Sequence, residues 1–155
     1  MPTCGGPIHR TMHAIPTSVA APLLAALGQQ LHRFFRHLDE RRYDELLQLF
    51  TEDCRWLRQG QWLQGRPAVR LALEARAADM ETRHVMSNGY VAACDGDRAT
   101  LEAYMTAYRY PLGTVLPQAA GPLRMNLATT VFRLDPGHDW RIAEQRLVPA
   151  VAFSA

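Results

Sequence analysis

The chain has 155 residues, of which 48% are hydrophobic and 21% are charged, and its formal net charge is +2. These values are typical of one soluble domain that buries about 70% of its unfolded surface. Acidic and basic residues are interleaved and form no basic stripe, so no nucleic-acid partner is expected. All 17 basic residues are arginine, which excludes a Schiff-base lysine and the lysine of a phosphate-binding loop.

The first segment, residues 1–20, mixes Gly, Pro, Ser and Thr without a period. Such a composition predicts a flexible tail, followed by a single domain at residues 21–155. The longest apolar run, around residues 19–27, is interrupted by Pro22 and is too short to span a bilayer. No membrane association is therefore expected.

Three cysteines, Cys4, Cys54 and Cys94, are odd in number and lack the spacing of metal ligands. They indicate neither a disulfide framework nor a zinc site. A reducing cytoplasm is therefore the expected location, and no metal or other cofactor is expected.

The first regular element is a helix that begins near residue 20 and runs for about five turns. Its apolar stripe follows three- and four-residue spacing through Leu23, Leu24, Leu27, Leu31, Phe34, Phe35 and Leu38. A second, short helix carries Leu46 and Leu47, and Asp39 lies at the junction between the two helices. A third helix is expected after Gly65, because Pro67 suits a first turn, where its missing N–H costs nothing.

Strand patterns dominate the rest of the chain. Residues 55–65 have strand composition around a Gln-Gly turn. Residues 83–93 and 99–110 flank an Asp-Gly turn, which is a strong hairpin signal, and residues 123–134 and 140–151 predict a second hairpin. Helices first and long antiparallel strands afterwards predict an α+β fold, with the helices packed on one face of a curved sheet.

Four segments, "FFRHLDERRYDELLQLFTEDCRW", "TRHVMSN", "DGDRAT" and "DWRIAEQRL", follow one another in this order. Their order and spacing resemble the SnoaL-like branch of the nuclear transport factor 2 superfamily, over roughly residues 24–149. The resemblance implies a conical α+β barrel, in which about three N-terminal helices pack on a strongly curved, mostly antiparallel sheet around a pocket. The superfamily includes dehydratases, ketosteroid isomerases, polyketide cyclases and the β subunits of ring-hydroxylating dioxygenases, so the fold does not decide the function.

The resemblance also implies a catalytic pair. In members similar to scytalone dehydratase, an aspartate at the end of the first helix faces a histidine at the start of the first long strand, and Asp39 in "HLDE" and His84 in "TRHV" match these positions. A carboxylate that orients an imidazole lets the ring accept and return a proton near neutral pH. The structural alternative is that Asp39 terminates the helix and that His84 binds it as a latch.

Period-two alternation places His84, Met86, Asn88 and Tyr90 on one face of the first long strand. On the next strand, Tyr104 and Tyr108 share a face. If this face points inward, the tyrosines join Met86 and Asn88 in a substrate pocket with a few polar groups over an apolar cup. The alternative places the tyrosines on an exposed sheet face or in a dimer contact.

The other substrate-binding candidates depart from the pattern of the family. Trp56 could stack on a flat ring, although such a residue is more often part of the core. Scytalone-type sites carry paired tyrosines, and this chain has Leu38 and Arg58 at those places. Such sites also carry a second histidine, whose nearest equivalent here is Tyr108. Asn126 is close to an expected asparagine but one residue out of register, which turns it to the opposite face unless a bulge intervenes.

Two functions of different classes fit these residues. The first is a cofactor-independent lyase or isomerase, similar to a dehydratase or cyclase, that transfers protons on a small ring-containing or polyketide-like molecule. The second is a non-catalytic scaffold or ligand-binding protein that resembles the β subunit of an aromatic-ring-hydroxylating dioxygenase, with the large dioxygenase subunit as its partner. A small hydrophobic or aromatic ligand and a second copy of the chain are the partners expected of the enzyme. The chain is shorter than expected of such a subunit, which favours the enzyme.

Overall fold

The computed structural model describes residue 15 and residues 17–115, 121–137 and 139–153. The described residues form three helices, α1 (Thr17–Asp39), α2 (Tyr43–Gln48) and α3 (Gly65–Glu74). They also form six strands, β1 (Phe50–Arg58), β2 (Gln61–Gln64), β3 (Met80–Asp95), β4 (Arg98–Pro111), β5 (Arg124–Leu134) and β6 (Trp140–Ala152). The predicted α+β order is therefore confirmed.

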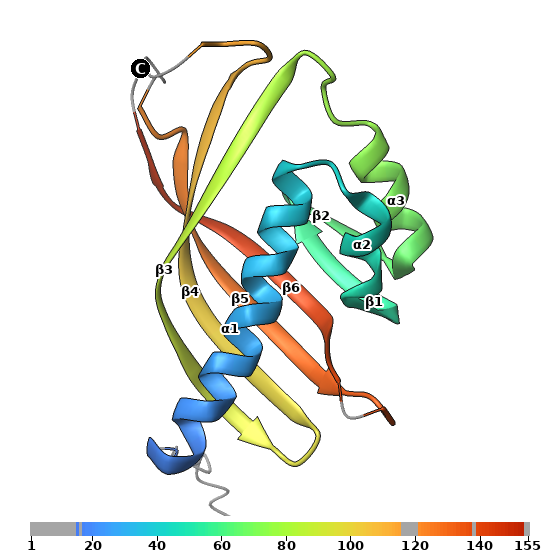
Figure 1. The fold of residues 1–155 in the computed structure, drawn as a ribbon, viewed down its shortest axis with the longest axis vertical. Helices are drawn as coiled ribbons and strands as arrows, with labels where there is room; N and C mark the ends of the chain where they lie inside the picture. The colour runs from blue at the N-terminus through green and yellow to red at the C-terminus, as the bar shows by residue number, and fades with distance from the viewer. Residues whose placement is uncertain (1–14, 16, 116–120, 138, 154–155) are drawn as a thin grey trace, which may run out of the picture.

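One sheet contains all six strands, in the order β2-β1-β6-β5-β4-β3. β1 and β6 run parallel, and every other neighbouring pair runs antiparallel. The sheet is curved, α1 crosses one of its faces, and α2 and α3 lie beside β1 and β2 (Figure 1). We call the face toward α1 the inner face and the opposite face the outer face. Because β3 pairs only with β4, it is an edge strand whose free side borders α1.

α1 begins earlier than the composition predicts. Its first residue is Thr17, inside the segment assigned to the tail, and its last is Asp39. Pro22 lies inside the helix, beyond its first turn, so it removes the backbone hydrogen bond that its N–H would have donated to the carbonyl of Ser18. Residues 1–14 and 16 lie outside the described residues, so the rest of the tail stays a prediction.

Both predicted hairpins are confirmed. Asp95 and Arg98 face each other at the end of the β3–β4 ladder, and Leu134 faces Trp140 at the end of β5–β6. Gly96 in the first turn has φ +58°, a conformation that glycine adopts without the steric cost of a side chain. The Asp-Gly pair therefore predicted this turn correctly, because hairpin turns need a positive φ that glycine readily adopts.

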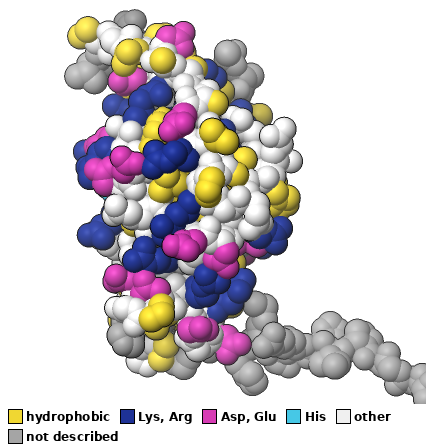
Figure 2. Space-filling model, turned by 90° about the vertical axis from the view of Figure 1, so that its right-hand side faces the viewer, with side chains coloured by type: hydrophobic (Ala, Val, Ile, Leu, Met, Phe, Trp, Pro, Cys, Tyr) yellow, Lys and Arg dark blue, Asp and Glu magenta, His cyan; other side chains and the backbone are white. Residues whose placement is uncertain are grey.

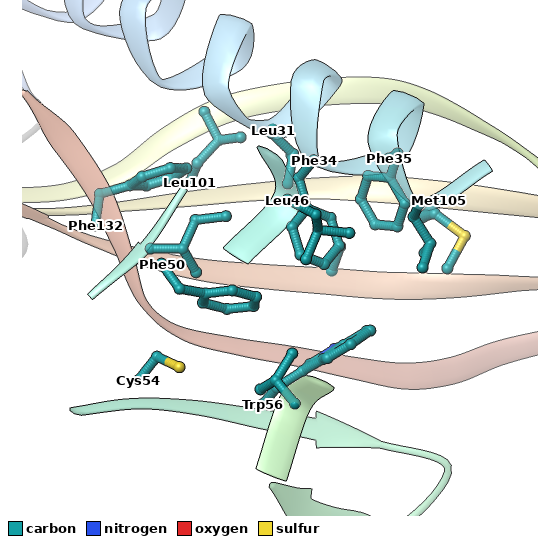
Figure 3. Packing of buried hydrophobic residues seen from close by; sticks show 14 of the residues in the cluster. Leu31, Phe34, Phe35, Leu46, Phe50, Cys54, Trp56, Leu101, Met105 and Phe132 are labelled. Carbon is teal, nitrogen blue, oxygen red and sulfur yellow. The ribbon is translucent and has the colours of Figure 1, made fainter. Parts of the chain in front are cut away.

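The core fills the space between α1 and the middle of the inner face (Figure 3). The ring of Phe34 lies edge-on to Phe50 and to Trp56, with centroid distances of 5.4 Å in both cases. Figure 3 shows Phe34 and Phe35 pointing from α1 toward the sheet and Trp56 rising from β1. Since offset or edge-on aromatic contacts add to the free energy gained by burial, this cluster holds α1 on the sheet.

Charged side chains of both signs are interspersed on the side that carries α2 and α3 (Figure 2). Arg70 on α3 donates to Asp44 on α2 at 2.5 Å. Arg133 donates to both carboxylate oxygens of Asp53, at 2.7 and 3.1 Å, and these bonds lower the pKa of Asp53 to about 2. None of the described helices is long and apolar enough to cross a membrane.

Candidate functional site at the seam between α1 and β3

Asp39 at the end of α1 meets His84 near the start of β3. Nδ1 of His84 lies 2.6 Å from Oδ1 of Asp39, and the backbone N–H of His84 donates to Oδ2 of Asp39 at 2.9 Å. The side chains of His84 and Asp39 are only 10% and 7% exposed. The two groups that the resemblance pairs are thus held together largely out of bulk water, and their catalytic role stays a prediction.

The carboxylate of Asp39 also sets the orientation of the ring. A carboxylate only accepts hydrogen bonds, so Nδ1 of His84 carries the hydrogen in this contact. In a neutral ring, the second nitrogen Nε2 then has a free lone pair. The ring of Phe35 lies 5.2 Å from the imidazole, centroid to centroid, and restrains its rotation. The arrangement therefore presents Nε2 as the atom that can take up a proton.

Thr82 and Arg76 extend this network, and sequence analysis did not select either of them. The hydroxyl of Thr82 donates to Oδ1 of Asp39 at 3.0 Å and accepts from Nη2 of Arg76 at 2.6 Å. Arg76 also donates to the carbonyl of Leu38 and to the hydroxyl of Tyr43. Period-two spacing from His84 could have identified Thr82, whereas no local pattern marks Arg76.

A pocket of about 380 Å³ lies beside the pair. Its lining comes from α1, the residue that follows α1, and β3, and it consists of His32, Phe35, Arg36, Asp39, Glu40, Arg83, His84, Val85 and Met86. Two ion pairs flank it, one between Arg36 and Glu40 and one between Arg83 and Glu81. The pocket that contains the pair therefore lies at the edge of the sheet, between the helix and the edge strand.

Met86 and Asn88 follow His84 along this seam. Met86 lines the pocket of the pair, and both residues line a neighbouring hollow of about 350 Å³. Asn88 has φ +53° and lies in an irregularity between Ser87 and Tyr90, where β3 has one residue more than β4. This bulge ends the regular alternation, so the prediction that Tyr90 shares the face of His84 is wrong. Tyr90 lies on the outer face and donates to Glu102.

Trp56 and Arg58 lie away from this pocket. Trp56 is 1% exposed and belongs to the aromatic core, so the core interpretation fits its position. The guanidinium of Arg58 lies 5.6 Å from the centroid of the Trp56 ring, and its pKa is lowered by burial and by the nearby charge of Arg76. Neither residue lines the hollows along α1 and β3.

Tyr104 and Tyr108 lie on the face of β4 opposite to the predicted one. The buried residues of β4 are Ala99, Leu101, Ala103, Met105 and Ala107, so the tyrosines lie on the outer face. Tyr104 pairs with Ser87 and is 41% exposed, and Tyr108 pairs with Arg83. The prediction that they point into the pocket is wrong, because the small residues of β4 take the face toward α1.

Asn126 reaches the inner face after all. It pairs with Met105, is 5% exposed, and its amide lies 3.9 Å from the sulfur of Met105. Alternation along β5 is regular here, with Asn126, Ala128 and Thr130 all buried, and the register shift at Asn126 places its extra residue in β6. Asn126 therefore faces inward without a bulge in its own strand. Asn126 does not line either hollow at the seam.

Three residues with buried polar atoms lie side by side across the middle of the inner face. Trp56 pairs with Gln145, and Gln145 pairs with Thr130. Within the part of the chain that the structure describes, Nε1 of Trp56, the amide of Gln145 and the hydroxyl of Thr130 have no hydrogen-bond partner. Ordered water commonly satisfies such groups. The described residues contain no group of three His, Cys, Asp or Glu side chains that could hold a metal.

Comparison with known families decides the family of the chain. The profile of the SnoaL-like domain matches residues 21–146. The chain belongs to the SnoaL-like domain family. The resemblance noted in the sequence, and the fold that it implies, are thereby confirmed. A search of curated protein sequences finds no match to this SnoaL-like domain.

Solved structures share the fold. A proposed scytalone dehydratase from Novosphingobium aromaticivorans has a TM-score of 0.72 and 19% identity, over 87% of this SnoaL-like domain's chain and 89% of its own. The β subunit of a proposed aromatic-ring-hydroxylating dioxygenase from the same organism has a TM-score of 0.68 and 15% identity, over 87% and 94% of the two chains. A protein of unknown function from Mycobacterium tuberculosis has a TM-score of 0.71 and 21% identity, over 84% and 77%. At these identities the likeness concerns the fold alone.

Proposed function

We propose that this SnoaL-like domain is a cofactor-independent lyase or isomerase. It transfers a proton on a small ring-containing or polyketide-like molecule in the pocket between α1 and β3. The observation that carries the proposal is the 2.6 Å contact between Asp39 and His84 on the wall of a pocket of about 380 Å³. A pair that served only as a latch would not need to border a hollow of this size.

The first step uses the free lone pair of Nε2. His84 takes a proton from a carbon next to a carbonyl group, the C–H electrons form a C=C bond, and the carbonyl π electrons move to oxygen as an enolate. Asp39 then faces a positively charged ring at hydrogen-bond distance, which stabilises the imidazolium. Arg36 and His32 on the same wall carry N–H groups that can stabilise the enolate oxygen.

The second step returns the proton. In an isomerisation, the imidazolium protonates a different carbon of the enolate. In a dehydration, it protonates a hydroxyl group that leaves as water while the enolate electrons form the new double bond. In both cases His84 ends neutral and Asp39 remains a carboxylate, so no cofactor is consumed.

The test follows the exchange of α-protons in 2-tetralone, a ring-containing ketone. In D₂O, the native chain should exchange these protons faster than buffer, as measured by ¹H NMR. His84→Gln should lower the enzymatic rate about 100-fold or more, the range expected when a general base is lost. His37→Gln, on the opposite side of α1, is the matched control and should keep the rate. Circular dichroism checks that each variant is folded.

Two results would contradict the proposal. One is exchange by the native chain at the rate of buffer alone. The other is an equal rate in the native chain and in a folded His84→Gln variant, which would leave Asp39 and His84 as a structural latch.

Association with a second copy is also part of the proposal. The outer face carries an exposed apolar row across neighbouring strands, formed by Tyr104, Leu127 and Val148. Glu102 and Arg146 lie on the same face in the next row. A face with an apolar centre and both signs of charge is able to pair with itself around a two-fold axis.

The alternative function is a scaffold that binds a large dioxygenase subunit through this same outer face. The fold shared with a dioxygenase β subunit favours it. Analytical ultracentrifugation of the purified chain distinguishes self-association from binding of a large dioxygenase subunit. A dimer that Leu127→Glu converts to monomers supports self-association, whereas a monomeric native chain contradicts it. The scaffold is supported if the monomer forms a complex with a co-expressed dioxygenase large subunit.

A further inference from the structure

A second hollow, of about 350 Å³, continues the seam beyond the pocket of the pair. His32 and Met86 line both hollows, so the two are contiguous. The walls of the second hollow are largely apolar and include Leu24, Leu31, Leu101 and Ala103. The seam therefore has a polar end at Asp39 and His84 and an apolar end toward the start of α1.

Gly28 opens this second hollow from the side of α1. It lies in the middle of the helix, where glycine lowers helix stability relative to alanine. A close neighbour does not explain the glycine, because a Cβ at this position would meet nothing within 4 Å. Gly28 is also among the residues that line the hollow. The helix thus has glycine, a residue of low helix propensity, at a position where a larger side chain would occupy the hollow.

The bulge in β3 opens the hollow from the other side. Asn88, with φ +53°, and Gly89 lie in the bulge, and both line the hollow. A positive φ at a residue other than glycine is unfavourable and is tolerated best by Asn and Asp. Two local departures from regular structure, one in α1 and one in β3, therefore face the same space.

We propose that this second hollow, the cleft formed by Leu24, Gly28, Asn88, Gly89 and Leu101, binds the apolar portion of an elongated amphipathic ligand. The carbonyl end of the ligand lies at His84, and this part of the inference rests on the proposed function. Gly28 and Asp39 are eleven residues apart on one helix, a separation of about 16 Å at the rise of an α-helix. A ligand that fills both hollows is therefore longer than one ring or two fused rings.

The face of α1 that borders the seam is consistent with such a ligand. Leu24, Gly28 and His32 are spaced by four residues, and Phe35 and Asp39 continue the same face, so apolar and open positions give way to polar ones in one direction. Each buried methylene group of a ligand raises affinity by about fourfold. An apolar chain in the cleft would thus contribute binding without touching the reacting carbonyl.

The experiment compares the binding of 2-hexanone and 2-decanone by isothermal titration calorimetry. These probes have the same carbonyl end and differ by four methylene groups. The native chain should bind 2-decanone at least about tenfold more tightly, which allows for partial burial of the added methylenes. Gly28→Leu should remove this difference and should raise the melting temperature, because leucine is the better helix former.

Control variants distinguish obstruction of the cleft from a general effect of a larger side chain on α1. Ala26→Leu places a leucine side chain on α1 at an exposed position that does not line either hollow, and it should keep the preference. Ala25→Phe, at an exposed position that lines the cleft, is a second blocking variant and should lose it. Exchange of the short 2-hexanone in D₂O should be similar in the native chain and in Ala26→Leu.

Three results would overturn the inference. They are equal affinity for the two ketones, no measurable binding of 2-decanone to the native chain, and an unchanged preference in folded Gly28→Leu and Ala25→Phe variants. Failure of the proton-transfer proposal has a different signature, since exchange would be absent while the chain-length preference remained.

Discussion

The two sides of α1 differ in what they face. Toward β1 and β6, Phe34 meets the rings of Phe50 and Trp56, and the space is packed. Toward β3, Gly28 and the bulge at Asn88 border hollows, and Asp39 holds His84 at the far end. One helix therefore has two different sides: the packed side fixes its position, and the open side borders the hollows in which we propose that a ligand binds.

The largest expected effect tests the packed side. Phe34→Ala should lower the free energy of unfolding by about 3–5 kcal/mol, because it removes buried aromatic surface and leaves a cavity. Gly28→Ala, on the open side, should instead raise it by about 0.5–1 kcal/mol. Urea denaturation measures both. A similar loss of unfolding free energy in the two variants would mean that both sides of α1 are equally packed.

Cysteine reactivity contrasts the core with the surface. Cys54 is buried, and burial raises the pKa of its thiol to about 11, whereas Cys94 is exposed. Because the thiolate is the reactive form, Cys54 should react about 100-fold more slowly with 5,5′-dithiobis(2-nitrobenzoate) than Cys94. The measurement uses Cys4→Ser protein, with Cys54→Ser and Cys94→Ser to assign the phases. Equal rates in the folded protein would show that the core opens readily.

The network around Asp39 should contribute less stability than the aromatic core. Asp39→Ala leaves the backbone N–H of His84 and the hydroxyl of Thr82 without an acceptor, which should cost about 1–3 kcal/mol. Glu40→Ala, which removes an exposed carboxylate one residue later, should cost about 1 kcal/mol or less. Urea denaturation would contradict this account if the two variants were equally stable.

The smallest expected effect concerns pH. Arg133 lowers the pKa of Asp53 to about 2, so their contact contributes stability above the ordinary pKa of an aspartate and loses it as pH falls toward 2. Because both side chains are largely exposed, the contribution should be below about 1 kcal/mol. The stability difference between the native chain and Asp53→Asn, present at pH 6, should shrink at pH 2.5. A difference that grew at low pH would contradict the assigned cause.

The fold was largely predictable from local patterns. The apolar spacing of α1, Pro67 at the start of α3 and the Asp-Gly turn at Gly96 each specify structure over a few residues. Asp39 and His84 were selected through a family resemblance, which carries information about residues 45 positions apart in the chain.

The wrong predictions concern which face of a strand points toward α1. Alternation groups the residues of a strand but does not say which group faces α1, so Tyr104 and Tyr108 were assigned to the wrong side. The bulge at Asn88 interrupts the alternation of β3. Asn126 is a different case, because the alternation of β5 places it inward, and only its alignment with the family pattern was one residue out of register. Arg76 was missed because its role depends on contacts with Leu38 and Thr82 that exist only in the folded chain.

Ligand mapping by NMR tests the central claim most directly. In ¹⁵N-labelled protein titrated with 2-decanone, we expect the largest chemical-shift changes at the amides of His32, Met86 and Gly89, with little change at the indole N–H of Trp56. The opposite pattern, with changes concentrated at Trp56 and at the side-chain amide of Gln145 while β3 stays unperturbed, would place the ligand in the middle of the sheet and contradict a functional site at the seam.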